Sequence, residues 1–301
     1  MDMAETETTA DSGWSRPGAT DDASGRVTLA VVFCLLSMSS VQFGAALSKP
    51  AMESLGAFGA TWLRLSWAAA FLLLVVRPPF LRYSRAQWLS ALSLGATMAV
   101  MTLCFFAAIA RIPLGLAVAI EFLGPLTVAA VFGGRGWRLL CPVMAAAGVL
   151  CLSWDGSAWV ADTPGLLFAL GAAIGWGGYI VLMKQAGQRF KGLEGLAVSL
   201  LFAALFATPF GLHQVQSGFS FDMLLVTAGL AMLVPLLPYA LEFMALRRMQ
   251  PSAFGILMSL EPAIGAGAGF IVLGQALALN QILGVVLVMI ASVAGTLLAK
   301  A

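Results

Sequence analysis

Four charged side chains stand inside long apolar stretches of this 301-residue sequence: Arg64, Glu121, Glu242 and Glu261. A charge in the hydrocarbon core of a bilayer is costly, and one that is kept there usually serves function. A buried carboxyl group can accept a bond from an ammonium group, or it can hold and release a proton. These four residues therefore mark where chemistry is expected.

Arg64 and Glu121 fall at equal depth, roughly 12 Å below the same membrane surface at 1.5 Å of rise per residue. Equal depth permits an ion pair that only fixes the fold, because arginine favours fixed, paired geometry. In the functional interpretation, Glu121 meets a substrate ammonium and Arg64 tunes that carboxylate or meets a substrate carboxylate. Glu242 either lines a cavity or reaches the interface and pairs near Arg247, and Glu261 is a second candidate coupling charge.

Prolines accompany these acids. Pro125 and Pro262 remove backbone donors in mid-membrane, and Pro238 precedes Glu242. Carbonyl groups freed in this way must be met by protein, water or ligand. The prolines are therefore expected either to break helices at a gate or to form packing kinks between small-residue faces.

Polar and adaptable side chains complete the candidate substrate site. A buried glutamine, an indole N–H and a phenol all need hydrogen-bond partners, and methionine repacks around different ligands. The expected substrate-binding residues are Gln42, Met101, Glu121, Trp176, Tyr179, Tyr239, Glu242 and Met258.

The sequence lacks the residues that several kinds of chemistry require. It has no Walker motif, no cluster with metal-ligand spacing, no catalytic set around its one histidine, and no ring of basic residues for phosphate. The four cysteines form no Cys-x-x-Cys pair. We therefore expect no enzyme, no metal, no cofactor and, at a net charge of +2, no nucleic-acid partner.

The elements that carry these residues must be membrane helices. The sequence is 60% hydrophobic and 10% charged, which no soluble core of this size could bury. Windows of about 20 apolar residues, the length of a transmembrane helix, predict ten spans. They cover residues 27–48, 57–76, 86–110, 114–132, 137–154, 165–184, 193–212, 221–244, 252–273 and 279–299. Residues 1–26 are polar and acid-rich and are expected to form a disordered cytoplasmic tail.

The distribution of basic residues predicts the orientation. With both termini in the cytoplasm, Lys49 and Arg111 fall outside and Arg64 within the second span. All the other lysines and arginines then fall on the inner side, as the positive-inside rule requires.

The two halves of the chain resemble each other. Arg111-Ile112-Pro113-Leu114-Gly115 resembles Arg248-Met249-Gln250-Pro251-Ser252, and the same separation carries Pro125 onto Pro262. Five helices is an odd number, so the second half enters the membrane upside down. The sequence thus predicts two inverted five-helix repeats, residues 27–154 and 163–299, as in alternating-access transporters.

Four segments carry a family resemblance. They are residues 40–49 (SVQFGAALSK), 112–125 (IPLGLAVAIEFLGP), 237–242 (LPYALE) and 257–262 (LMSLEP). Over residues 27–299 the chain resembles the EamA-type branch of the drug/metabolite transporter superfamily, and more narrowly bacterial threonine/homoserine exporters. The resemblance implies a multi-pass exporter in the bacterial inner membrane, with a central cavity lined by both halves.

The combined expectation is alternating-access export of amino acids, of the threonine and homoserine type and extending to other neutral or aromatic ones. An exporter of other small metabolites or of cationic drugs is the alternative, since the buried acids suit a cation equally well. A nucleotide-sugar carrier should need more basic residues, and a membrane enzyme, scramblase or channel forms another class. The oligomeric state and any proton coupling are left open by the sequence.

Overall fold

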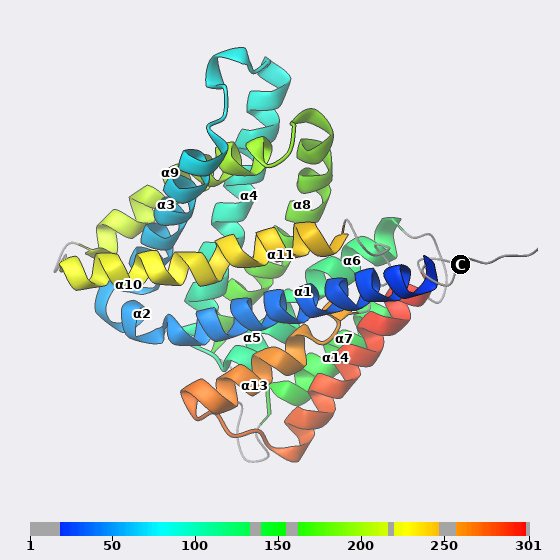
Figure 1. Ribbon diagram of the computed structural model, residues 1–301. Helices are drawn as coiled ribbons and strands as arrows, with labels where there is room; N and C mark the ends of the chain where they lie inside the picture. Colours follow the sequence, from blue (N-terminus) through cyan, green and yellow to red (C-terminus); the bar gives the residue numbers. More distant parts are fainter. Residues whose placement is uncertain (1–18, 133–139, 155–161, 216–219, 247–256, 299–301) are drawn as a thin grey trace, which may run out of the picture.

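The computed structural model describes residues 19–132, 140–154, 162–215, 220–246 and 257–298, and every regular element in them is a helix (Figure 1). In the first half the elements are α1 (Ala19–Leu47), α2 (Lys49–Leu55), α3 (Ala57–Val76), η1 (Phe80–Arg82), α4 (Arg85–Ile109), α5 (Leu114–Glu121), α6 (Leu123–Phe132) and α7 (Leu140–Leu152). In the second half they are α8 (Thr163–Arg189), α9 (Glu194–Gln214), α10 (Phe221–Ala231), η4 (Met232–Leu236), α11 (Leu237–Leu246), α13 (Glu261–Leu273) and α14 (Leu279–Leu298).

Within the part of the chain that the structure describes, six segments are long and apolar enough to cross a bilayer: 28–47, 57–76, 85–109, 163–189, 194–214 and 221–242. Four shorter apolar helices cover 114–128, 143–152, 261–273 and 279–294. The prediction of an all-helical membrane protein is therefore confirmed. Each expected window overlaps one of these segments.

The first helix begins earlier than expected. Helix α1 starts at Ala19, so residues 19–26 are helical rather than part of a disordered tail, while residues 1–18 lie outside the described part of the chain.

Two spans are interrupted near their prolines. The chain leaves the α-helix between α5 and α6 at Phe122, and a turn at Ser259 and Leu260 precedes α13. The span that contains α10 and α11 is interrupted by the π-helical turn η4, where Val234 is non-helical (φ −147°, ψ 112°) just before Pro235. A proline lacks the backbone donor that would continue the helix, so carbonyl groups at these breaks are free to accept other bonds.

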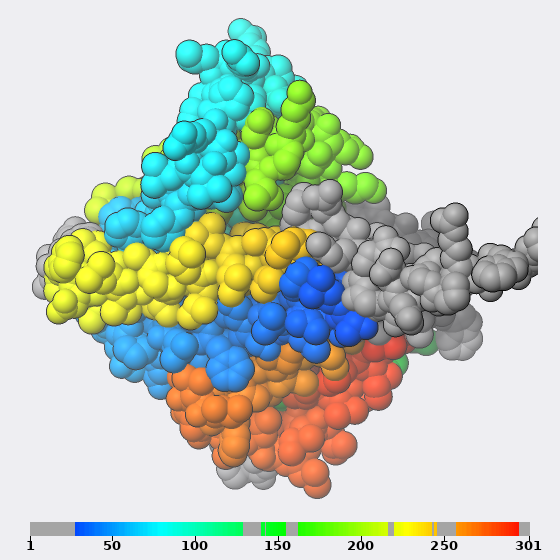
Figure 2. All heavy atoms as spheres, viewed as in Figure 1, coloured from blue at the N-terminus to red at the C-terminus, as the bar shows by residue number. Residues whose placement is uncertain are grey.

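The helices pack as pairs drawn from the two halves of the chain. Helix α3 packs on α9, α5 on α13, and α7 on α14. Helix α4 also packs on both α8 and α9. Helix α11 packs on α1, and α10 packs on α3. In Figures 1 and 2, α1 lies between the α10–α11 segment on one side and α13 with α14 on the other.

Small residues let these helices approach closely. A Cβ atom at Gly175 of α8 would lie 2.8 Å from Cα of Met101 on α4, so the two backbones touch there. Gly44 of α1 lies against Val234 in the same way, with 2.5 Å between its Cβ position and Cγ2 of Val234. Close approach through glycine is typical of helix contacts in membranes, where it replaces the hydrophobic effect as the source of association.

Candidate functional site

The predicted residues Gln42 and Glu261 lie in contact, although they are far apart in the sequence. Nε2 of Gln42 on α1 donates a hydrogen bond of 3.1 Å to Oε1 of Glu261, the first residue of α13. Gln42 is 1% exposed and Glu261 is 5% exposed. Oε1 of Gln42 and Oε2 of Glu261 are buried without a hydrogen-bond partner. The pair thus presents two unmet acceptor atoms in the interior.

Glu242 contacts the same helix α1 further along. Its Oε1 accepts a hydrogen bond of 2.9 Å from Ser37 Oγ, and Ser37 also lies 3.4 Å from the carbonyl oxygen of Pro238. Ser40 donates at 2.8 Å to the carbonyl oxygen of Leu233 in η4. The interrupted segment is therefore held against α1 by hydroxyl groups. The carboxyl of Glu242 is thus engaged by α1, and Arg247, its other expected partner, lies outside the described residues.

Glu121, like Glu242, is half-buried, whereas Glu261 is buried. Glu121 ends α5 directly before the break at Phe122, and within the described residues its carboxylate has no hydrogen-bond or ion-pair partner. Glu261 lies within electrostatic range of both Glu121 and Glu242. The three acids therefore form one negative region contributed by both halves of the chain.

Aromatic side chains surround this region. The rings of Tyr179 on α8 and Tyr239 on α11 lie 6.1 Å apart between centroids, tilted by 33°. Trp176, one turn before Tyr179, meets Phe122 edge-on at 5.5 Å. Both tyrosines and Trp176 are half-buried. These phenols and this indole supply polar edges in an otherwise apolar wall.

The two predicted methionines and the three prolines fall on the same elements. Met101 lies on α4 where α8 crosses it, and Met258 packs between the core and the α1 face, directly before the turn that leads to Glu261. Pro125 follows the break at Phe122, Pro262 occupies the first turn of α13, and Pro238 stands in the first turn of α11. Each predicted proline is thus within a turn of an interrupted span.

Arg64 does not pair with Glu121. Its guanidinium donates to Oγ of Ser48 at 3.2 Å and to the carbonyl oxygen of Val234 at 3.3 Å, and it stacks over the ring of Phe106 at 3.9 Å. Arg64 is 1% exposed, and no carboxylate of the described residues lies within ion-pair distance of it. The structure therefore contains no ion pair between Arg64 and Glu121, although their equal depth in the membrane permitted one. The arginine instead satisfies the broken backbone of η4.

Ser37, Ser40 and Ser48 are site residues that sequence reasoning did not select. They lie with Gly44 on one face of α1 and were visible as a small-residue stripe, which favours close packing. The sequence signal that could have identified these serines lies in the span that faces them. Pro235 and Pro238 leave backbone carbonyl groups without their helical donors, and hydroxyl groups can donate to such carbonyls. Ser48 links both features, since it donates to the Gly44 carbonyl and accepts from Arg64.

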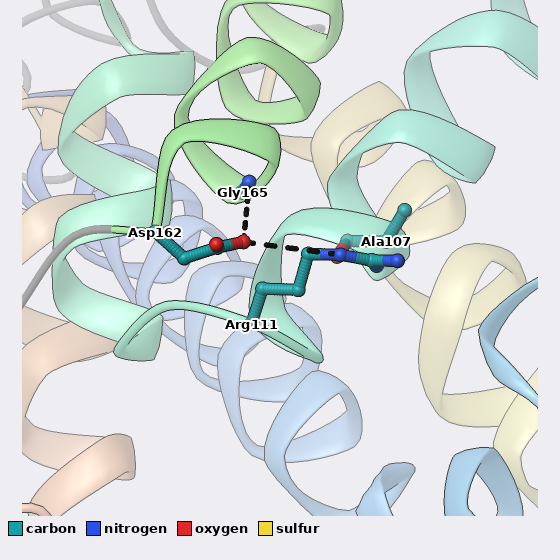
Figure 3. Close-up of polar contacts among 4 residues, drawn as sticks. All are labelled: Ala107, Arg111, Asp162 and Gly165. Atoms are coloured by element: carbon teal, nitrogen blue, oxygen red, sulfur yellow. Dashed lines mark hydrogen bonds and ion pairs between the residues drawn. The ribbon is translucent and has the colours of Figure 1, made fainter.

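Polar links also join the helices at the end of the bundle that carries Arg111. Nε of Arg111 lies 3.9 Å from Oδ2 of Asp162, whose same oxygen accepts from the backbone N–H of Gly165 and caps α8 (Figure 3). Nearby, Gln214 Oε1 accepts from the backbone N–H groups of Phe58 and Gly59 at 2.8 and 3.2 Å. We call this the Arg111 end.

A cavity of about 210 Å³ lies among the ends of α5, α7, α13 and α14. Gln275 lines it and accepts a hydrogen bond of 3.1 Å from the backbone N–H of Leu114. Gln281 also lines it and donates to the carbonyl oxygen of Leu152. Both glutamines satisfy helix ends, so the cavity is separate from the three acids.

Comparison with known proteins gives concordant matches. Residues 163–296 match the model of the EamA-like transporter family. The chain is 38% identical to the threonine/homoserine exporter RhtA of Salmonella typhimurium over 277 residues, and the match covers 90% of this chain and 92% of the exporter. It is 36% identical over 275 residues to the exporter of the same name from Escherichia coli, with the same coverage. A solved crystal structure with 18% identity shares the fold, with a TM-score of 0.61, and the match covers 89% of this chain and 98% of that one.

Proposed function

This chain belongs to the EamA-like transporter family as a relative of the threonine/homoserine exporters, and on that premise we propose that it exports amino acids by alternating access. It is a multi-pass protein of the bacterial inner membrane. Threonine and homoserine are the first candidate substrates, and other neutral or aromatic amino acids the next.

One observation carries the proposal beyond the resemblance. Glu121 is half-buried, has no bonding partner among the described residues, and lies near the phenols of Tyr179 and Tyr239 in a region built from both halves. An α-ammonium group supplies the donors that an unpartnered carboxylate lacks, and charge-assisted bonds of this kind are strong. Trp176, Met101 and Met258 provide an apolar wall that can adapt to different side chains.

The packing of the helices supports two inverted repeats, 27–154 and 163–299. If the second five spans repeat the first five, then the pairs α3–α9, α5–α13 and α7–α14 join corresponding spans. The contacts α4–α8 and α11–α1 are then equivalents of each other. Interruptions at Phe122 and at Ser259–Leu260 also fall at corresponding places. Such a pairing is the expected result of a two-fold axis between halves.

Polar links join the two halves at both ends of the bundle, beginning with the Arg111 end. There, Arg111–Asp162, Gln214–Phe58 and Gln275–Leu114 each join helices from different halves. At the opposite end, Tyr83 bonds to Glu194 and Gln87 to Arg189, and these hydrogen bonds likewise join the two halves, between the α3–α4 and α8–α9 connections. With the basic residues predicting that this opposite end is cytoplasmic, the site would load from the cytoplasm and discharge through the Arg111 end.

Counterflow in proteoliposomes tests this function. Vesicles preloaded with unlabelled threonine should take up labelled threonine faster than empty vesicles, and homoserine, methionine and phenylalanine should compete to different extents. A sugar serves as the negative control, and a lipophilic cation tests the alternative of drug export. If the cation exchanges and no amino acid does, amino-acid export is wrong. If nothing exchanges, carrier function itself is wrong.

A further inference from the structure

We infer that Gln42 and Glu261 form a proton-binding site through which export is coupled to proton movement in the opposite direction. This inference rests on the proposed function and adds its driving ion. It starts from a structural mismatch: both unpartnered atoms of the buried pair, Gln42 Oε1 and Glu261 Oε2, are acceptors when the carboxylate is ionised.

A single proton resolves the mismatch. The amide already donates through Nε2 to Oε1 of Glu261 at 3.1 Å. A proton on Oε2 turns that atom into a donor, and the amide oxygen of Gln42 is the unmet acceptor on the same pair. A carboxylic acid and a primary amide can then bond twice, side by side, with both groups neutral. An ionised carboxylate with one bond in this interior would carry a large desolvation cost.

The surroundings leave space for a proton and little more. A Cβ atom at Gly265, one turn after Glu261, would lie 3.2 Å from Oε1 of Gln42 and 3.0 Å from Cγ2 of Val118. A methyl group would already be crowded there, so an ammonium group on a carbon skeleton does not fit beside the pair. Glu121 and Glu242 are half-buried and therefore more accessible than Glu261, which separates substrate binding from proton binding.

The charged groups that face the pair are acids. Helix α13 packs against α1, α5 and α14, and α5 contributes Glu121. Glu242 of α11 lies within electrostatic range, and Cys34 is a titratable group of α1 that lies beside Glu242. The described polar residues at the start of α14 are the neutral Asn280 and Gln281. The buried cation Arg64 is engaged by Ser48, Val234 and Phe106, so it does not neutralise the pair.

Proximity of Glu261 to Glu121 supplies the coupling. When Glu261 is ionised, two negative charges attract the substrate ammonium at Glu121. When Glu261 takes a proton, that attraction weakens and the substrate leaves more readily. By linkage, bound substrate likewise promotes loss of the proton. A proton taken up on one side of the membrane is thus exchanged for a substrate released there.

The experiment uses purified full-length protein in liposomes across which a pH gradient is imposed. Wild-type protein should accumulate labelled threonine on the acid side, up to about tenfold per pH unit if one proton is exchanged for each substrate. Glu261→Gln places an amide donor where the protonated acid would donate, so it should lose all gradient-driven accumulation, while counterflow continues with a raised half-saturation concentration. Gln42→Leu should weaken accumulation. Glu53→Gln, at an exposed position on α2, is the matched control and should accumulate as the wild type does.

The outcomes separate this inference from the function on which it rests. Counterflow without any gradient-driven accumulation in the wild type overturns proton coupling and leaves export standing. Absence of counterflow in the wild type overturns both. Infrared spectra at neutral pH cover the case in which Glu261→Gln is inactive: the variant should lose a protonated-carboxyl band. An unchanged band overturns the site whatever the transport result.

Discussion

The guanidinium of Arg64 donates a hydrogen bond of 3.3 Å to the carbonyl oxygen of Val234, the one residue of η4 with non-helical dihedral angles. Because Pro238, four residues further on, has no N–H to donate to it, this carbonyl group would otherwise be unmet. A charge inside the membrane is therefore used as a brace between α3, α1 and the interrupted span.

Replacing Arg64 should destabilise the protein. Arg64→Met removes the donors to Val234 and Ser48 and leaves a buried carbonyl oxygen unpaired, at a cost of about 1–3 kcal/mol. Arg64→Lys keeps a charge but lacks the planar fork, so its melting temperature should fall between those of Arg64→Met and the wild type. Thermal unfolding of detergent-purified protein without substrate measures both. Wild-type stability of Arg64→Met would refute the bracing role.

Glu121→Gln should weaken substrate binding without weakening the fold. The carboxylate has no partner to lose among the described residues, whereas a charge-assisted bond to an ammonium contributes about 1.5–3 kcal/mol. The half-saturation concentration for threonine counterflow should therefore rise roughly tenfold or more. The melting temperature should stay close to that of the wild type, and the exposed Glu53→Gln again serves as control. Unchanged half-saturation would remove Glu121 from the substrate site.

Two glycines of α8 should respond in opposite ways to alanine. Gly175→Ala places a methyl group against the backbone of Met101, which cannot move aside like the end of a flexible side chain. Overpacking of this kind costs typically about 1–3 kcal/mol. Gly187→Ala meets nothing within 4 Å and should stabilise the helix by about 0.5–1 kcal/mol. Melting temperatures of the two variants measure the difference, and equal shifts would contradict the close contact between α4 and α8.

The Tyr83–Glu194 contact predicts a stability change at alkaline pH. Burial and the 3.0 Å hydrogen bond to Glu194 raise the pKa of Tyr83 to about 12, against about 10 for an unfolded tyrosine. The stabilisation is fully present below about pH 10 and is lost as the pH rises toward 12, because the unfolded chain then releases its proton more readily. The melting temperature of the wild type should fall more steeply over that interval than that of Tyr83→Phe. Parallel curves would contradict the prediction.

Much of this architecture follows from single residue types. Intramembrane acids are rare enough that Glu121, Glu242 and Glu261 stood out at once, and the prolines located each interruption to within a turn. Partners were harder to predict, because rotation of a helix about its axis is set by packing along its whole length. Equal depth in the membrane therefore suggested an ion pair between Arg64 and Glu121. The rotation of α3 about its axis instead places the guanidinium against the carbonyl group of Val234. The contact between Gln42 and Glu261 joins α1 to α13, which no local pattern could specify.

Gln214 is the last residue of α9, and its side-chain oxygen accepts hydrogen bonds from two backbone N–H groups in the first turn of α3. One amide oxygen thus fastens a helix of each half to the other at the Arg111 end. Two neutral hydrogen bonds contribute about 2 kcal/mol between them, so the fastened form outnumbers the released form by roughly thirtyfold through this contact alone. In the proposed export cycle, this latch would have to release before substrate could leave through the Arg111 end.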